Sequence, residues 1–318
     1  MNQRWVKYYP MILQLVISLL ALGYVVNKMV RFTGWAVFFD QLAVKQWSFM
    51  AMLLAQLFLS VLNLSLEAFK WQLLSNVLIV QPFLDAFKQV IHGLQLGVLT
   101  PGRTGEPFGK ALLFTKGYRT QALLLSAAGS MIQNLVIVLM GGLAMVMVYN
   151  SQLPADGFLS LLRQKLVHYG FMIPVLLFLM ITGFYYLFRA FKANPLLKRL
   201  SFHLQVYRRL GFTLVMSLFG ITFLRYLVYA FQLWLALYFF GLMDNPLRWC
   251  LVSLYLMIIT FIPGIALADL GIRSSVALFL FGSGAMDTGA VVASVFIVWV
   301  FNLGLPSLSG FFLLKSKM

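Results

Sequence analysis

Two short segments of the sequence combine proline, glycine and charged residues within apolar surroundings. The first covers residues 100–107, Thr-Pro-Gly-Arg-Thr-Gly-Glu-Pro, and Lys110 follows it. Because proline suits the first turn of a helix and acidic residues are favoured there, a helix is expected to begin near Glu106. The unpaired amide hydrogens of that helix end, with Arg103 and Lys110, could bind a phosphate or carboxylate group while Glu106 serves as counter-ion or proton-linked switch. The alternative is a helix cap and an internal ion pair that only stabilise the break.

The second segment contains Pro263-Gly264 and then Asp269-Leu-Gly-Ile-Arg273. If a helix begins near Asp269, Arg273 lies one turn later on the same face, in the acid-first order that favours an ion pair. The spacing therefore predicts that the two residues pair. Arg273 could also serve as a second headgroup-binding residue, or the pair could simply neutralise itself. The residues expected to break the helices in the two segments are Pro101, Gly102, Gly105, Pro263, Gly264 and Gly271.

Other polar residues lie inside apolar stretches. Arg225 is midway along one of them, and Gln232 follows two turns later on the same helix face. Asn134 and Asn302 lie in two others. Such residues are expected to point toward the protein interior, where they either line a transport path or hold helices together. The candidate substrate-binding residues are accordingly Arg103, Glu106, Lys110, Arg225, Asp269 and Arg273.

Glu67, Lys70 and Trp71 form another polar group, just after an apolar run. Because charged and aromatic residues gather where a helix leaves the hydrocarbon, we interpret them as a helix end at the membrane interface. On this interpretation their role is anchoring and not transport.

The composition indicates that lipid surrounds most of the protein. Of 318 residues, 62% are hydrophobic and 10% are charged, whereas soluble domains average about 45–50% and about 25%. The formal net charge of +16 could favour nucleic acid, but basic residues of membrane proteins collect in cytoplasmic loops and beside anionic headgroups. We therefore expect membrane phospholipids as partners and no nucleic acid. A single cysteine and three scattered histidines predict no metal site, and no cofactor is expected.

Six apolar runs are long enough to cross a hydrocarbon core about 30 Å thick, which takes about 20 helical residues. They cover residues 11–30, 48–66, 122–148, 171–188, 212–241 and 289–314, with Pro306 expected to kink the last. Two further runs, in 83–116 and 249–284, are too short or too charged to span and are interrupted by proline and glycine. Each is predicted to enter the membrane, break and return, which is tolerated only where protein or a water-filled cavity surrounds the break.

The basic residues predict the orientation. Six of them and no acid lie between residues 188 and 211, the strongest cytoplasmic signal in the chain. Counting outward places both termini in the cytoplasm, although the loop with Lys28, Arg31 and Lys45 then becomes external. The broken pairs open toward opposite sides, so residues 48–148 and 211–314 form an inverted repeat within a single transmembrane domain, 1–318. The predicted fold is an all-α integral membrane protein with about six transmembrane helices and two re-entrant helix pairs.

At these two segments the sequence resembles the transmembrane, flippase-like domain family of lysylphosphatidylglycerol synthases. The resemblance lies in Pro101 to Glu106 of the first half and in Ile262 to Arg273 of the second, and it covers most of the chain. The chain resembles a stand-alone member that ends at Met318 without the family's aminoacyl-transferase domain, so no transferase activity is carried over. The resemblance implies movement of anionic or headgroup-modified phospholipids across the bacterial inner membrane.

The leading hypothesis is therefore a lipid transporter that works without ATP, because no phosphate-binding loop ending in Gly-Lys-Ser or Gly-Lys-Thr is present. The protein is not expected to be an enzyme. One alternative is nevertheless a membrane enzyme acting on a lipid-linked substrate, with Glu106 or Asp269 as acid or base and Arg103 holding phosphate. Another is a non-transporting partner subunit. A transporter requires both breaks to face one continuous cavity with lateral access to lipid, which a partner subunit does not need. The oligomeric state, a homo-oligomer included, is left open.

Overall fold

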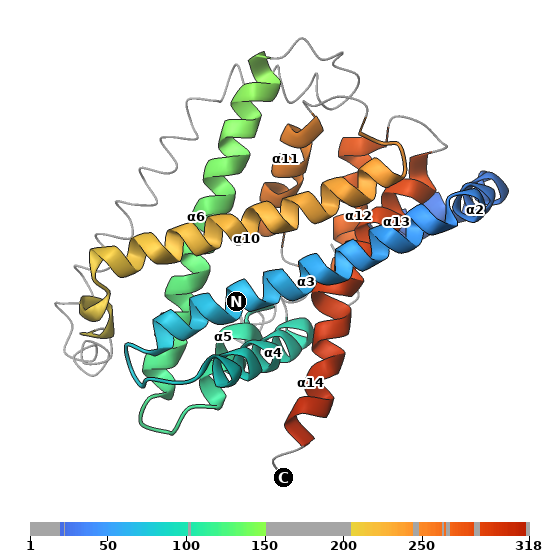
Figure 1. Ribbon diagram of the computed structural model, residues 1–318. Coiled ribbons are helices and arrows are strands. Elements are labelled where there is room, and N and C mark those ends of the chain that lie inside the picture. The colour runs from blue at the N-terminus through green and yellow to red at the C-terminus, as the bar shows by residue number, and fades with distance from the viewer. Residues whose placement is uncertain are drawn as a thin grey trace, which may run out of the picture.

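The computed structural model describes residues 20–21, 23–100, 103–150, 205–243, 248–262, 264, 268–282 and 287–315, and every regular element in these ranges is helical (Figure 1). A helical segment at 23–30 comes first. It is followed by α2 (Trp35–Val44), α3 (Gln46–Ser75), α4 (Phe83–Leu99), α5 (Gly105–Leu112), α6 (Arg119–Asn150), the 3-10 helix η3 (Gln205–Arg209), α10 (Phe212–Phe239), α11 (Arg248–Phe261), α12 (Ala268–Phe281), α13 (Asp287–Trp299), the π-helix η4 (Val300–Gly304) and α14 (Leu305–Lys315).

Four of these stretches are long and apolar enough to cross a membrane. They are α3, α6, α10 and the continuous run from α13 through η4 into α14. Each matches a predicted span, at 48–66, 122–148, 212–241 and 289–314. The predicted span at 171–188 lies outside the described residues, and the one at 11–30 lies mostly outside them, so a total of six stays a prediction.

The last span contains a π turn just before Pro306. Proline has no amide hydrogen, and its ring would clash with the carbonyl four residues earlier in a regular helix. The chain widens instead over η4, where the Leu305 amide donates to the carbonyl of Val300. The carbonyl of Phe301 accepts a hydrogen bond of 2.6 Å from the hydroxyl of Ser60. The π turn thereby joins the last span to α3.

The first broken segment is a hairpin in which α4 and α5 run antiparallel in close contact (Figure 1). A Cβ atom on Gly109 would lie 2.7 Å from Cα of Gly93, so only glycine lets the two backbones approach this closely. Thr100 closes the break, because its hydroxyl accepts a 2.7 Å hydrogen bond from the amide of Gly105. A helix was expected to begin near Glu106, and the start of α5 at Gly105 confirms this. Pro101 and Gly102 lie outside the described residues.

The second broken segment consists of α11 and α12. The return helix α12 is described from Ala268, in agreement with the start near Asp269 on which the expected Asp269–Arg273 pair depended. Gly264 lies in the break, where a Cβ atom would meet Cα of Asp269 at 2.7 Å, and Pro263 lies outside the described residues. Gly271 was expected to break a helix. This expectation is wrong, because the residue lies inside α12. A single glycine weakens a helix by only about 1 kcal/mol, so it does not by itself interrupt one.

Helices α3 and α10 run side by side through the middle of the described structure (Figure 1). Gln56 of α3 and Gln232 of α10 are both fully buried. The side-chain amide of Gln56 donates to the carbonyl of Gln232 at 2.7 Å, and the amide of Gln232 donates to the carbonyl of Gln56 at 3.3 Å. The inward orientation expected for Gln232 is thus confirmed, and its role at this position is to hold two helices together.

The close contact of the first hairpin leads to a prediction. Gly109→Ala is expected to lower the thermal unfolding temperature of the purified protein, because overpacking costs about 1–3 kcal/mol. Gly142→Ala in α6 is the matched control, since nothing lies within 4 Å of the added carbon. Both variants would be heated in the same detergent as the wild type. Equal unfolding temperatures for the two variants would contradict the tight α4–α5 contact.

Candidate functional site

A cavity of about 400 Å³ lies where α3, α6 and α10 meet the two broken helix pairs. Arg103, Thr104 and Glu106 line it from the first break, and Ile262, Gly264, Asp269 and Arg273 line it from the second. Two segments far apart in the sequence therefore face one space. Of the predicted site residues, Arg103, Glu106, Arg225, Asp269 and Arg273 line the cavity, and Lys110 lies behind its wall.

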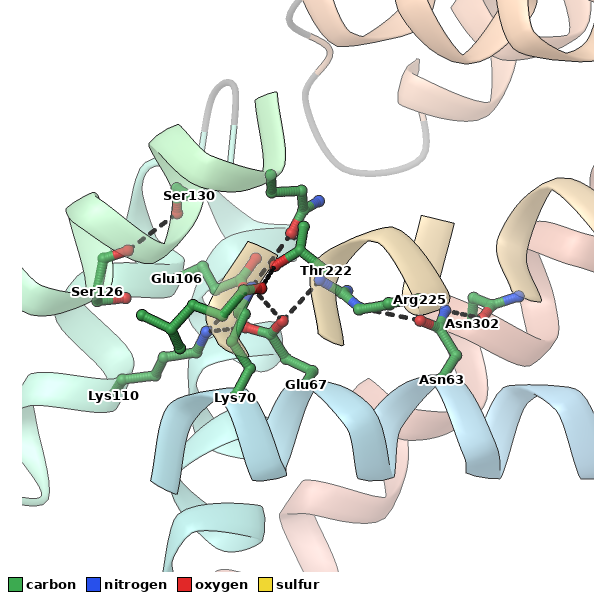
Figure 2. A network of polar contacts seen from close by, with 12 residues as sticks. Asn63, Glu67, Lys70, Glu106, Lys110, Ser126, Ser130, Thr222, Arg225 and Asn302 are labelled. Carbon is green, nitrogen blue, oxygen red and sulfur yellow. Dashed lines mark hydrogen bonds and ion pairs between the residues drawn. The ribbon is translucent and has the colours of Figure 1, made fainter. Parts of the chain in front are cut away.

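Glu67 of α3 is the centre of a buried ionic network beside the cavity (Figure 2). Its carboxylate lies 2.6 Å from the ammonium of Lys70, 2.7 Å from that of Lys110 and 2.6 Å from Nη1 of Arg225. Glu67 is 3% exposed. One acid thus forms ion pairs with cations from three helices, α3, α5 and α10, and holds these helices together.

The interpretation of Glu67, Lys70 and Trp71 as a helix end at the interface is wrong. The helix continues to Ser75, and all three side chains are buried. A membrane helix can carry charges at such a position when they are paired inside the protein. The available signal was an acid and a base three residues apart, a spacing that puts both charges on one helix face directly after the apolar run.

Lys110 connects the first hairpin to α3. Besides Glu67, it contacts the carboxylate of Glu106, 3.1 Å away and one turn earlier on α5. Its ammonium also lies 5.6 Å from the ring centre of Trp71, where a cation–π interaction adds to the ionic contacts. Glu106 therefore forms its ion pair with Lys110, and within the described residues no ion pair joins it to Arg103.

Asp269 and Arg273 form the predicted ion pair, with 2.6 Å between the carboxylate and Nε. Nη1 of Arg273 also donates to the hydroxyl of Tyr229 in α10 at 3.3 Å. Each return helix thus carries an acid in its first turn and a base one turn later. This arrangement repeats the Glu106–Lys110 pair of the first half.

Arg225 connects the spans around the cavity. In addition to Glu67, its guanidinium donates to the side-chain oxygens of Asn63 at 2.9 Å and Gln133 at 2.6 Å. Asn63 in turn donates to Asn302 of η4 at 2.8 Å. The network therefore reaches α3, α6, α10 and the last span, as Figure 2 shows for its labelled members.

Arg103 has an unusual backbone conformation. Its φ angle is 58°, and it is the sole residue other than glycine with positive φ in the part of the chain that the structure describes. A side chain in this left-handed region costs about 1–2 kcal/mol, and such strain is concentrated at functional sites. The turn directs the chain from the break into α5.

The charges in and behind the cavity wall do not balance. The basic residues are Lys70, Arg103, Lys110, Arg225 and Arg273, and the acidic ones are Glu67, Glu106 and Asp269. In their ordinary ionisation states the bases exceed the acids by two charges. Because uncompensated charge is costly away from water, the site favours an anionic ligand.

The sequence matches a known protein family over most of its length. A family model described as the lysylphosphatidylglycerol synthase TM region matches residues 11–310. The chain belongs to this family. The matched TM region includes both broken helix pairs and every residue that lines the cavity. The comparisons with curated proteins and with solved structures gave no match.

Proposed function

We propose that the protein is an ATP-independent, flippase-like transporter that moves anionic or headgroup-modified phospholipids across the bacterial inner membrane. The observation that supports this most strongly is the single cavity lined by both helix breaks, with its excess of positive charge. Membership of a TM-region family with a lipid-related function agrees with it.

The physical reason lies in the free energy of transfer. A phospholipid headgroup that enters hydrocarbon loses its hydration, which is strongly unfavourable for a charged group. Arginine side chains and polar groups inside a protein replace part of that hydration. A cavity of about 400 Å³ is within the usual range for small-ligand sites and suits a headgroup, while the acyl chains would remain in the lipid.

An inverted repeat, which we propose as part of this function, would explain how access could alternate. We place α4–α5 and α11–α12 as re-entrant pairs that enter from opposite faces, within the repeats 48–148 and 211–314. The sequence offset that relates Pro101 to Pro263 also relates Asn63 to Arg225, and these two side chains are in direct contact. Rocking one repeat against the other about this contact would expose the cavity to each leaflet in turn.

We further propose that both termini are cytoplasmic, because of the basic stretch between residues 188 and 211. A reporter fused after Met318 is expected to be active only if it folds in the cytoplasm. A periplasmic signal from this fusion would refute both the orientation and the inverted repeat.

The transport proposal can be tested in liposomes. Purified protein is expected to speed the movement of a fluorescent phosphatidylglycerol between leaflets, and Arg103→Gln should lower the rate by about tenfold or more, since a buried charged contact is worth about 1.5–3 kcal/mol. Arg31→Gln, at an exposed arginine away from the cavity, is the control.

The outcome also separates the alternatives. No acceleration for any anionic lipid, with or without a proton gradient, would reject the transporter and favour a partner subunit. Covalent conversion of the labelled lipid, detected by chromatography, would favour a membrane enzyme.

A further inference from the structure

Most of the basic groups at the cavity already have partners within the protein. Arg225 is bonded to Glu67, Arg273 is bonded to Asp269, and Lys110 lies between two carboxylates behind the wall. A ligand would have to compete with these carboxylates for the same donors. The excess charge alone therefore does not identify the atoms that contact a headgroup.

Besides the hydroxyl of Tyr226, two buried nitrogen donors on the cavity wall have no acceptor among the described residues. They are Nε of Arg103 and Nε1 of Trp299. Buried donors in native proteins nearly always have a partner, since leaving one unsatisfied is unfavourable. Both residues line the same cavity, so a ligand bound there with acceptor oxygens is a candidate partner for both donors.

The surrounding structure holds these two donors in place. Trp299 is the last residue of α13, directly before the π turn, and its ring packs against the buried cluster that includes Leu94 and Leu303. Single π turns within α-helices are frequent at functional sites. Arg103 is held by the left-handed turn between the break and α5.

We propose that Arg103 and Trp299 are the residues that contact the ligand, each donating a hydrogen bond to an oxygen of one phosphodiester group. The guanidinium of Arg103 supplies the charge, and the indole of Trp299 supplies a neutral donor. Arg225, Lys110 and Arg273 are positioning residues that hold the helices around the cavity. This inference rests on the proposed function for the lipid nature of the ligand, and its test measures binding without transport.

The test is calorimetric titration of the purified full chain in detergent with three probes. Dihexanoylphosphatidylglycerol carries the phosphodiester and short tails, sn-glycerol 3-phosphate carries a phosphomonoester on glycerol without tails, and dihexanoylglycerol carries the tails without phosphate. The wild type is expected to bind the first most tightly and the last least. Trp299→Phe and Arg103→Gln should each weaken binding of the first probe by about tenfold or more, the usual effect of losing a hydrogen bond to a charged acceptor.

The controls are Trp47→Phe and Arg31→Gln, two exposed residues outside the cavity lining, which should bind like the wild type. Unfolding temperatures of all variants would show that each is folded. The inference is refuted if Trp299→Phe binds like Trp47→Phe, or if dihexanoylglycerol binds as tightly as the phosphatidylglycerol. If sn-glycerol 3-phosphate binds as tightly as dihexanoylphosphatidylglycerol, the phosphate site is kept but its ligand is a soluble molecule. If the probes bind as expected but the protein does not move lipid between leaflets in liposomes, the transport proposal is rejected and the proposed binding site is kept.

Discussion

Glu67→Gln is expected to give the largest loss of stability of any single change in the network. The substitution keeps the size of the side chain but removes the one carboxylate that lies within 2.7 Å of Lys70, Lys110 and Arg225. Removing one partner of a buried ion pair costs about 3–5 kcal/mol, because the remaining charge is left uncompensated. Thermal unfolding of the purified protein in detergent would measure this effect.

Asp85→Asn is the matched control for this change. Asp85 also pairs with a lysine three residues later, Lys88, but at 3.9 Å and with a side chain that is 46% exposed. Such a surface pair contributes about 0–1 kcal/mol, so the variant should unfold close to the wild-type temperature. In Glu67→Gln, a further Lys70→Met substitution should recover part of the loss by removing one of the unpaired cations. If Glu67→Gln and Asp85→Asn behave alike, the network does not stabilise the fold.

The parts of the structure that could be predicted from sequence depend on local rules. The four spans follow from apolar length. The start of α5 follows from a proline and an acid in its first turn, and that of α12 from an acid alone. The Asp269–Arg273 pair follows from helix geometry, which brings residues four apart onto one face. Each of these features depends on neighbours within a few residues or on one uninterrupted run.

The network around Glu67 could not be predicted in the same way. Its partners Lys110 and Arg225 are 43 and 158 residues away in the chain. The charged residues Glu67 and Lys70 also ended the predicted apolar run at residue 66. The helix nevertheless continues to Ser75, because both charges are paired inside the protein. Likewise, nothing local connects Trp299 with Arg103. Only the packing of α13 and the first break around one cavity brings both donors to the same space.

Arg103→Gly should separate the roles of the Arg103 backbone and side chain. At a φ of 58°, glycine is unstrained, so the variant should unfold at or above the wild-type temperature. It also lacks the guanidinium, so lipid movement in liposomes should fall by about tenfold or more, as expected for loss of a charged hydrogen bond. A residue that only stabilised the break would instead lose stability on truncation.

Two further substitutions at this position complete the test. Arg103→Asn should resemble the glycine variant, since asparagine tolerates the left-handed region better than most residues. Arg103→Val should lose stability as well as transport, because β-branched side chains are strongly disfavoured at positive φ. Transport at the wild-type rate by the glycine variant would remove Arg103 from the lipid path. If the glycine and valine variants are equally destabilised, the guanidinium of Arg103 holds the hairpin together. Both variants lack this group, whereas only valine is strained at positive φ.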